Sequence, residues 1–165
     1  MTSYWILQSN PVLFRIDDAL AALEEDDWEI RQYTRHVHVG DRVYIWRAGD
    51  RAGIVARGVI IEEPSVRPAS IGTEYWIEPA HGERLEHRAL VHYDRKIRPP
   101  ILRSDLRYHP ALASLSILRR PLGTVFPVTG EEASAIEEII ELSTEIEARR
   151  RMTERYQETG ACSSS

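Results

Sequence analysis

The chain has 165 residues, of which 42% are apolar and 28% are charged, and it contains a single cysteine. That length suits one domain with its own hydrophobic core, and one cysteine excludes a disulfide framework or a cysteine-based zinc site. No apolar run reaches the roughly 18 residues that span a membrane, and residues 1–10 lack the features of a signal peptide. We therefore expect one cytoplasmic domain over residues 1–150 and a disordered polar tail over residues 151–165.

The net charge of −5 is unevenly distributed along the chain. Residues 1–130 carry 17 basic and 17 acidic side chains, whereas residues 131–165 carry 4 and 9. Within the neutral part, residues 84–120 carry 9 basic against 3 acidic side chains, and all basic residues except Lys96 are arginine. Arginine suits bidentate contacts with phosphate, although a genome-wide codon preference explains the same excess. The acidic total therefore does not argue against a nucleic-acid partner.

The first half of the chain predicts strands with one helix. Residues 4–8 are a short apolar run that ends in a Ser-Asn-Pro turn, which indicates a strand followed by a turn. Residues 16–25 have apolar side chains at helical spacing, and the acidic residues 24–27 interrupt that pattern. Residues 43–61 are expected to form a hairpin. In its first strand, Val43 and Ile45 face one side while Tyr44 and Trp46 face the other.

The second half predicts further strands and one long helix. Residues 75–77, 85–93 and 124–128 are expected to be strands, Pro99-Pro100 is expected to break the chain, and residues 104–115 read as short helix or irregular structure. Residues 129–150 form the clearest helix. Thr129 and Glu132 match a capping box, and Ile136, Ile139, Ile140 and Ser143 form one stripe. The chain is therefore an α+β protein built round a curved sheet or small barrel.

Motifs for catalysis or metal binding are lacking in the sequence. His36 and His38 form an H-x-H pair, but no third metal ligand is placed by spacing, and two histidines at a sheet edge explain the pair equally well. Ser9 has no candidate base near it in the sequence and reads as a turn residue. No nucleophile elbow, phosphate-binding glycine loop or zinc-protease motif occurs. We predict no catalytic residue, no metal and no cofactor.

The four tryptophans lie near the ends of predicted strands. Trp5 sits inside the first strand and is expected in the core, whereas Trp28, Trp46 and Trp76 have polar or charged neighbours. An aromatic ring beside polar groups suits a pocket for a planar ligand, since stacking on a nucleobase contributes about 1–3 kcal/mol. Tryptophan also commonly packs in a core. The pattern alone leaves both interpretations open.

Six segments, in order, resemble the EVE domain family. They are Tyr4–Pro11, Trp28–Gln32, the pair Val37–Trp46 with Gly53–Gly58, and the pair Pro110–Leu112 with Val125–Glu132. EVE domains belong to the PUA-like superfamily, a pseudo-barrel with flanking helices that includes the YTH readers of methylated adenine. The resemblance implies a PUA-like α+β pseudo-barrel of mixed and antiparallel strands with flanking helices. It also implies a non-catalytic reader of a modified base, above all 5-methylcytosine in DNA, which is flipped into an aromatic pocket.

The resemblance assigns a base pocket by position. The pocket residues that it implies are Gln8, Ser9, Asn10, Trp28, Gln32, Trp76 and His92, and Trp46 is a further aromatic candidate for the same pocket. Arg31 and Arg35 lie beside Trp28 and are expected to contact phosphate. On this hypothesis Trp28→Ala abolishes discrimination between modified and unmodified DNA and leaves the fold intact. Gln8, Asn10 and Gln32 replace the family's usual Lys, Glu and Asn, which leaves the identity of the base open.

Two other functions found in the same superfamily are alternatives to the DNA reader. One is an RNA-binding PUA-like module for a modified RNA base, and the other is an ASCH-like amidohydrolase. The hydrolases use a lysine near a glycine-rich turn, and Lys96 lies outside any such motif. The expected partners are nucleic acid and a restriction or modification-dependent nuclease. No membrane contact is expected. The expected oligomeric state is a monomer or a weak homodimer.

Overall fold

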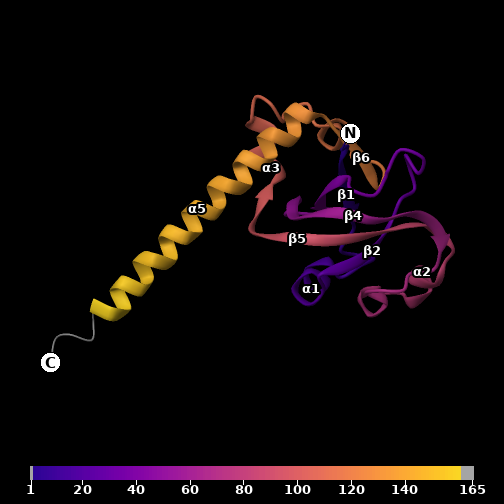
Figure 1. Cartoon of the computed structure of the whole chain (residues 1–165), viewed down its shortest axis with the longest axis horizontal. Coiled ribbons are helices and arrows are strands. Elements are labelled where there is room, and N and C mark those ends of the chain that lie inside the picture. Colours follow the sequence, from indigo (N-terminus) through magenta and orange to yellow (C-terminus); the bar gives the residue numbers. More distant parts are fainter. Residues whose placement is uncertain (1, 161–165) are drawn as a thin grey trace.

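A computed structural model describes residues 2–160. Six strands form one mixed sheet in the order β2-β5-β4-β3-β1-β6. The strands are β1 Tyr4–Ser9, β2 Glu25–Glu29, β3 Arg42–Arg47, β4 Gly53–Arg67, β5 Glu86–Leu102 and β6 Val125–Val128. β1 and β3 run parallel, and every other neighbouring pair is antiparallel. The sheet curls without closing, as Figure 1 shows, which confirms the expected α+β pseudo-barrel with open edges.

Helices flank this sheet and connect its strands. They are α1 Ile16–Ala22, the 3-10 helix η1 Thr73–Tyr75, α2 Pro79–Glu83, α3 Arg103–Tyr108, α4 Ser116–Arg119 and α5 Gly130–Gly160. None of the helices within residues 2–160 combines the length and the apolar composition that a membrane crossing requires. The short helices sit at the ends of the strands, so their loops shape the rim of the sheet.

The predicted hairpin and its alternation are confirmed. β3 pairs antiparallel with β4, and Val43 and Ile45 pack in one core while Tyr44 and Trp46 pack in a second core on the opposite face. A strand buried on both faces requires apolar side chains at every position. Gly53 allows β5 to approach, because a Cβ there would lie 2.2 Å from the carbonyl oxygen of Ile101.

Three expectations for the strands are wrong. The acidic residues after α1 form β2, because the buried Asp27 accepts hydrogen bonds from the end of β4 and the segment after it. The donors are the Arg67 guanidinium and the backbone N–H groups of Ser70 at 2.6 Å and Ile71 at 3.0 Å. Residues 75–77 form no strand, and only a single bridge joins Phe14 to Trp76. β5 also continues through the proline pair, since residues 97–100 fall in a gap in the pairing with β4 where no N–H is required.

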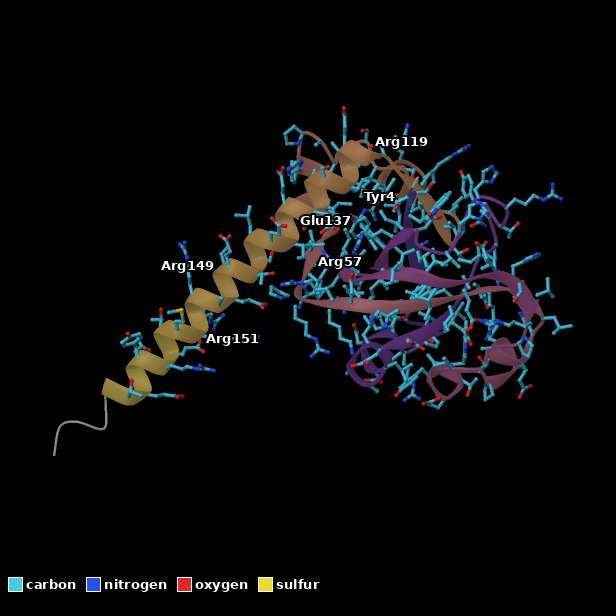
Figure 2. All side chains as sticks on the ribbon, in the orientation of Figure 1. Tyr4, Arg57, Arg119, Glu137, Arg149 and Arg151 are labelled. Atoms are coloured by element: carbon cyan, nitrogen blue, oxygen red, sulfur yellow. The ribbon has the colours of Figure 1, made fainter. Side chains whose placement is uncertain are left out.

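The long C-terminal helix divides into a packed half and a projecting half. The capping box is confirmed, because the Thr129 N–H donates to Glu132 at 2.9 Å and the Glu132 N–H donates to the Thr129 hydroxyl at 3.2 Å. Ile136 and Ile140 are buried against the sheet. Figure 2 shows Glu137 facing Arg57, whose guanidinium lies 2.6 Å from the carboxylate. These contacts fix the first half of α5 on the domain.

The second half of α5 extends away from the sheet (Figure 1). Residues 151–160, expected to be disordered, continue the helix, and all of them are exposed. Ion pairs one turn apart, such as Arg150 with Glu154 at 3.1 Å, support this segment. The remainder of the expected tail, residues 161–165, lies outside the described residues.

Candidate functional site

A cavity of about 330 Å³ opens where the parallel strands β1 and β3 both end. Parallel neighbours bring the turns that follow them to the same edge of a sheet. The backbone N–H of Ala48 donates to the carbonyl of Ser9 at 2.9 Å and holds the two turns together. α4 and the loop after it cover the opening. The cavity is lined by Gln8, Asn10, Trp46, Ala48, Gly49, Ala52, Arg103, Ile117 and Pro121.

The side-chain amide of Gln8 has hydrogen-bond partners at its nitrogen but none at its oxygen within residues 2–160. Its nitrogen donates to the carbonyls of Pro121 at 3.2 Å and Gly123 at 2.8 Å, which holds the α4–β6 loop over the cavity. Because two carbonyls require the NH₂ group on that side, the oxygen of Gln8 points elsewhere. Among residues 2–160 that oxygen has no hydrogen-bond donor. The cavity wall therefore carries a free acceptor.

Asn10 follows β1 in the turn that the sequence predicts. Its side-chain oxygen accepts from the Val12 N–H at 3.0 Å, and its carbonyl accepts from the N–H groups of Leu13 and Phe14 at 3.0 Å each. These bonds make an Asx turn that fixes the side chain at the rim. The NH₂ group of Asn10 has no acceptor within the described part of the chain. Because Asn10 is exposed and lines the cavity, this group is a free donor at the rim.

Trp46 and Arg103 supply the other polar groups of the wall. Trp46 is only 3% exposed and packs in the second core, and its indole N–H has no acceptor among residues 2–160. Arg103 follows β5 directly, and its buried Nε likewise lacks a hydrogen-bond partner there. Small and apolar groups complete the lining. The cavity thus combines an aromatic wall, unpaired donors and one unpaired acceptor, the composition typical of a ligand pocket.

The structure places Trp28 inside the core, away from this cavity. Trp28 is 7% exposed, on the edge strand β2 at the opposite side of the sheet order from β1. Its indole N–H donates to the hydroxyl of Tyr93 at 2.8 Å, and that hydroxyl lies 3.3 Å from the carboxylate of Asp26. Burial raises the pKa of Asp26 to about 7. Trp28 is therefore a packing residue in a closed polar cluster.

Trp76 and His92 also lie apart from the cavity. Trp76 packs edge-on against Phe14 with ring centroids 5.0 Å apart, and the guanidinium of Arg88 sits 5.9 Å over its ring. A side chain at Gly82 would collide with the indole, and the ring is partly buried against the first core. His92 is half-exposed on β5, 3.9 Å from the carboxylate of Glu25. These two residues are separated from the turn after β1 that the resemblance assigned to the same pocket.

Ser9 and Gln32 support the cavity from behind its surface. Ser9 is buried and is not part of the lining. Gln32 follows β2, and its side-chain oxygen accepts from the N–H groups of Thr124 at 3.0 Å and Val125 at 3.1 Å. This contact bridges the two open edges of the sheet. Gln32 therefore positions the same loop that Gln8 holds.

The two arginines expected to contact phosphate differ in their surroundings. Arg31 is paired with Glu29 at 2.9 Å and lies 3.9 Å from Glu86, so nearby carboxylates compensate its charge. Arg35 is exposed, and its side chain contacts no partner among residues 2–160. Within those residues no cluster of three metal-ligating side chains is present either.

Sequence reasoning missed most of the lining. It named Gln8, Asn10 and Trp46, but not Ala48, Gly49, Ala52, Arg103, Ile117 or Pro121. Small apolar residues leave no signal of a pocket in a sequence. The excess of basic residues over 84–120 did include Arg103. Its position at the cavity depends on the exit of β5 beside the loop between β3 and β4.

A curled mixed sheet, flanking helices and a cavity at the ends of parallel strands define a PUA-like protein. A sequence profile of the EVE domain matches residues 3–139, so the chain belongs to the EVE domain family. Among curated proteins, none matches this sequence. The projecting half of α5 lies beyond the matched residues.

Solved structures share this fold at low sequence identity. A hypothetical protein from Leishmania major is 19% identical with a TM-score of 0.67, covering 87% of this chain and 98% of that one. Human THYN1 in complex with DNA containing 5-methylcytosine is 19% identical with a TM-score of 0.63, covering 86% and 98%. The DUF55 domain of human thymocyte nuclear protein 1 is 22% identical with a TM-score of 0.63, covering 85% and 99%.

Proposed function

We propose that this protein is a non-catalytic reader that binds a modified base in DNA, foremost 5-methylcytosine, by taking the flipped base into the cavity between β1 and β3. The observation that carries the proposal is the cavity itself, which combines a tryptophan, unpaired polar groups and an apolar wall. Membership of the EVE family and the DNA-bound THYN1 neighbour supply the choice of ligand class.

The unpaired groups of the cavity match the hydrogen-bonding edge of cytosine. That edge presents one amino donor beside two acceptors. The free oxygen of Gln8 complements the amino group, and the NH₂ group of Asn10 and the indole N–H of Trp46 complement the acceptors. Base pairing is lost when the base flips, at a cost of a few kcal/mol. These groups replace the lost bonds and offset that cost.

The apolar part of the lining accounts for a methyl group on the base. Ala48, Ala52, Ile117 and Pro121 contribute carbon surface to the cavity. Burying one methyl carbon stabilises a complex by about 0.8 kcal/mol, which gives a preference of roughly fourfold over the unmodified base. Larger discrimination requires the polar groups to fix the base so that its methyl faces this wall.

The composition of the lining favours binding over catalysis. Among the described residues, its only ionisable side chain is Arg103, and it contains no carboxylate, histidine or thiol. General acid–base catalysis needs a group that gains and loses a proton near neutral pH, and arginine stays protonated. The proposed reader therefore binds its base without changing it.

A binding panel on matched oligonucleotides tests this proposal. Fluorescence anisotropy at one fixed salt concentration would compare unmodified, hemimethylated, fully methylated, hydroxymethylated and N6-methyladenine duplexes with an RNA of the same sequence. We expect the tightest binding to a duplex with modified cytosine. Equal affinity for all of them would contradict the reader, and a preference for the RNA would favour the RNA-binding module instead.

A variant pair ties the preference to the cavity. Asn10→Ala removes the rim donor and is expected to lose about tenfold in affinity for the modified duplex, because one hydrogen bond in a site is worth about 1–3 kcal/mol. Gln157→Ala removes an exposed amide from the projecting half of α5 and is the matched control. Thermal unfolding monitored by circular dichroism shows whether Asn10→Ala keeps its fold without the Asx turn. Unchanged affinity of folded Asn10→Ala for the modified duplex would reject this cavity as the base site.

A further inference from the structure

A second cavity adjoins the candidate base pocket. It measures about 310 Å³ and shares Gly49, Ala52 and Arg103 with the first cavity. The rest of its wall comes from Asp50 and Arg51 in the β3–β4 loop and from Leu102, Ser104 and Arg107 where β5 passes into α3. The guanidinium of Arg103 stands at the boundary, so one side chain borders both spaces.

The second cavity is strongly positive for its size. Its lining contains three arginines, Arg51, Arg103 and Arg107, against a single acidic residue, Asp50. Some arginines of the domain are neutralised by carboxylates, as Arg42 and Arg57 are by Asp94 at 2.9 Å each. No such ion pair engages the three cavity arginines within residues 2–160. Their uncompensated charge is a property of this place in the fold.

The side chain of Arg103 has a buried donor that lacks a hydrogen-bond acceptor among residues 2–160. Its Nε is buried and lacks a hydrogen-bond partner in the described chain. A buried charged donor without a partner costs free energy that a bound acceptor recovers. Its backbone N–H donates to the carbonyl of Ala52 at 2.8 Å, so the start of the side chain is fixed. The Ser104 hydroxyl lines the same wall and adds a neutral donor.

The geometry points to a phosphate subsite, and we propose that the second cavity binds a backbone phosphodiester of the DNA whose base occupies the first cavity. Arginine forms paired hydrogen bonds with phosphate oxygens, and three of them around one small cavity fit a group with one negative charge and two free oxygens. Arg103 would lie between base and phosphate, with Arg51 and Arg107 on the far wall. This assignment rests on the proposed function for the identity of the base, but not for the charge of the cavity.

The subsite changes which arginines carry the electrostatic part of binding. Arg31, expected from its place beside Trp28 to contact phosphate, is already paired with Glu29. Arg51, Arg103 and Arg107, which have no ion pair within residues 2–160, lie instead in the β3–β4 loop and in α3, next to the base cavity. A phosphate bound there fixes the register of the strand, so the flipped base enters the first cavity. Affinity therefore comes from the second cavity and selectivity from the first.

The salt dependence of DNA binding tests the subsite separately from base recognition. Anisotropy titrations of Arg51→Gln and Arg107→Gln over a range of NaCl concentrations would give the slope of log affinity against log salt. Each phosphate contact that is lost makes that slope shallower by about 1. We expect this change on methylated and unmethylated duplexes alike, with the ratio of their affinities preserved. Arg149→Gln, on the projecting half of α5 (Figure 2), is the matched control and is expected to leave the slope unchanged.

The outcomes separate the subsite from the reader. If Arg51→Gln and Arg107→Gln both match Arg149→Gln in slope and affinity, the phosphate subsite is wrong, whatever the wild-type protein prefers. If the slope changes but the wild-type protein shows no preference for a modified base, the subsite stands and the proposed base recognition fails. Arg35→Gln belongs in the same series, and a slope change confined to that variant would also overturn the subsite.

Discussion

Two places in this domain hold a tryptophan among polar groups, and they differ in whether those groups are satisfied. Around Trp28, the indole N–H, the Tyr93 hydroxyl and the Asp26 carboxylate bond to one another in a buried cluster. Around Trp46, the wall beside the indole is open to a cavity of about 330 Å³. The donors and acceptors of that wall are largely without protein partners among residues 2–160.

This contrast shows which feature marks a binding site. An aromatic residue with polar neighbours occurs in both places, so the sequence pattern does not separate them. The distinguishing feature is unpaired hydrogen-bonding capacity next to open volume, because a ligand recovers the free energy that such groups lack. The hydrogen-bonding groups of the Trp28 cluster are already paired with one another. It stabilises the fold, whereas the cavity is available for a ligand.

The largest expected effect is a loss of folding stability when Trp28 is substituted. Trp28→Ala is predicted to lower the free energy of unfolding by about 3–5 kcal/mol, because a large ring is lost from the core. This revises the expectation that the variant keeps its fold and loses only discrimination. Chemical denaturation followed by tyrosine and tryptophan fluorescence measures the change. Trp28→Phe, which keeps most of the packing, is expected to discriminate modified DNA as the wild-type protein does.

The second effect is a pH dependence from the same cluster. Burial raises the pKa of Asp26 to about 7, above the value near 4 of an unfolded aspartate. The folded state then holds a proton that the unfolded state has released, so stability is lost as pH rises from about 4 to 7. Asp26→Asn is predicted to remove this loss and to be more stable than the wild-type protein at pH 8, by on the order of 2–4 kcal/mol.

Urea denaturation of both proteins at pH 5 and pH 8 checks the Asp26 prediction. Subtracting the two pH profiles removes the contribution of the histidines, which are the same in both proteins. Asp27 does not interfere, because its hydrogen bonds with Arg67 and the Ser70 and Ile71 N–H groups lower its pKa and keep it ionised over this range. If the free energy of unfolding changes equally in both proteins between pH 5 and pH 8, Asp26 is ionised in the folded protein throughout that range.

The smallest effect concerns Gln32, which links the two regions. Gln32→Ala is predicted to cost about 1–2 kcal/mol of stability and to weaken binding, since the loop over the cavity loses an acceptor for two backbone N–H groups. Gln32→Glu keeps a side-chain oxygen in that place and is the control. Thermal unfolding and anisotropy on one methylated duplex measure both properties. Equal behaviour of the two variants would show that the acceptor is unimportant.

Several features of the fold were predictable because they depend on residues close together in the sequence. The alternation of Val43 to Trp46 predicted a strand with two buried faces, and the spacing of Thr129 and Glu132 predicted the start of α5. Features that depend on distant partners were missed. β2 is a strand because Arg67 and the 70–71 backbone satisfy its acidic residues, and Trp76 is outside any strand because it packs between Phe14 and Arg88.

The sequence by itself determined the family and the order of the main elements, since an ordered set of local motifs carries that information. It also identified three residues of the cavity, Gln8, Asn10 and Trp46, all within or directly after predicted strands. Only the tertiary structure decided which tryptophan is closed off and which borders open space. It also decided that Arg51, Arg103 and Arg107 line one cavity, because the antiparallel pairing of β4 with β5 places Leu102 beside Gly53, at the end of the β3–β4 loop. Satisfaction of polar groups depends on three-dimensional neighbours, and no local pattern records it.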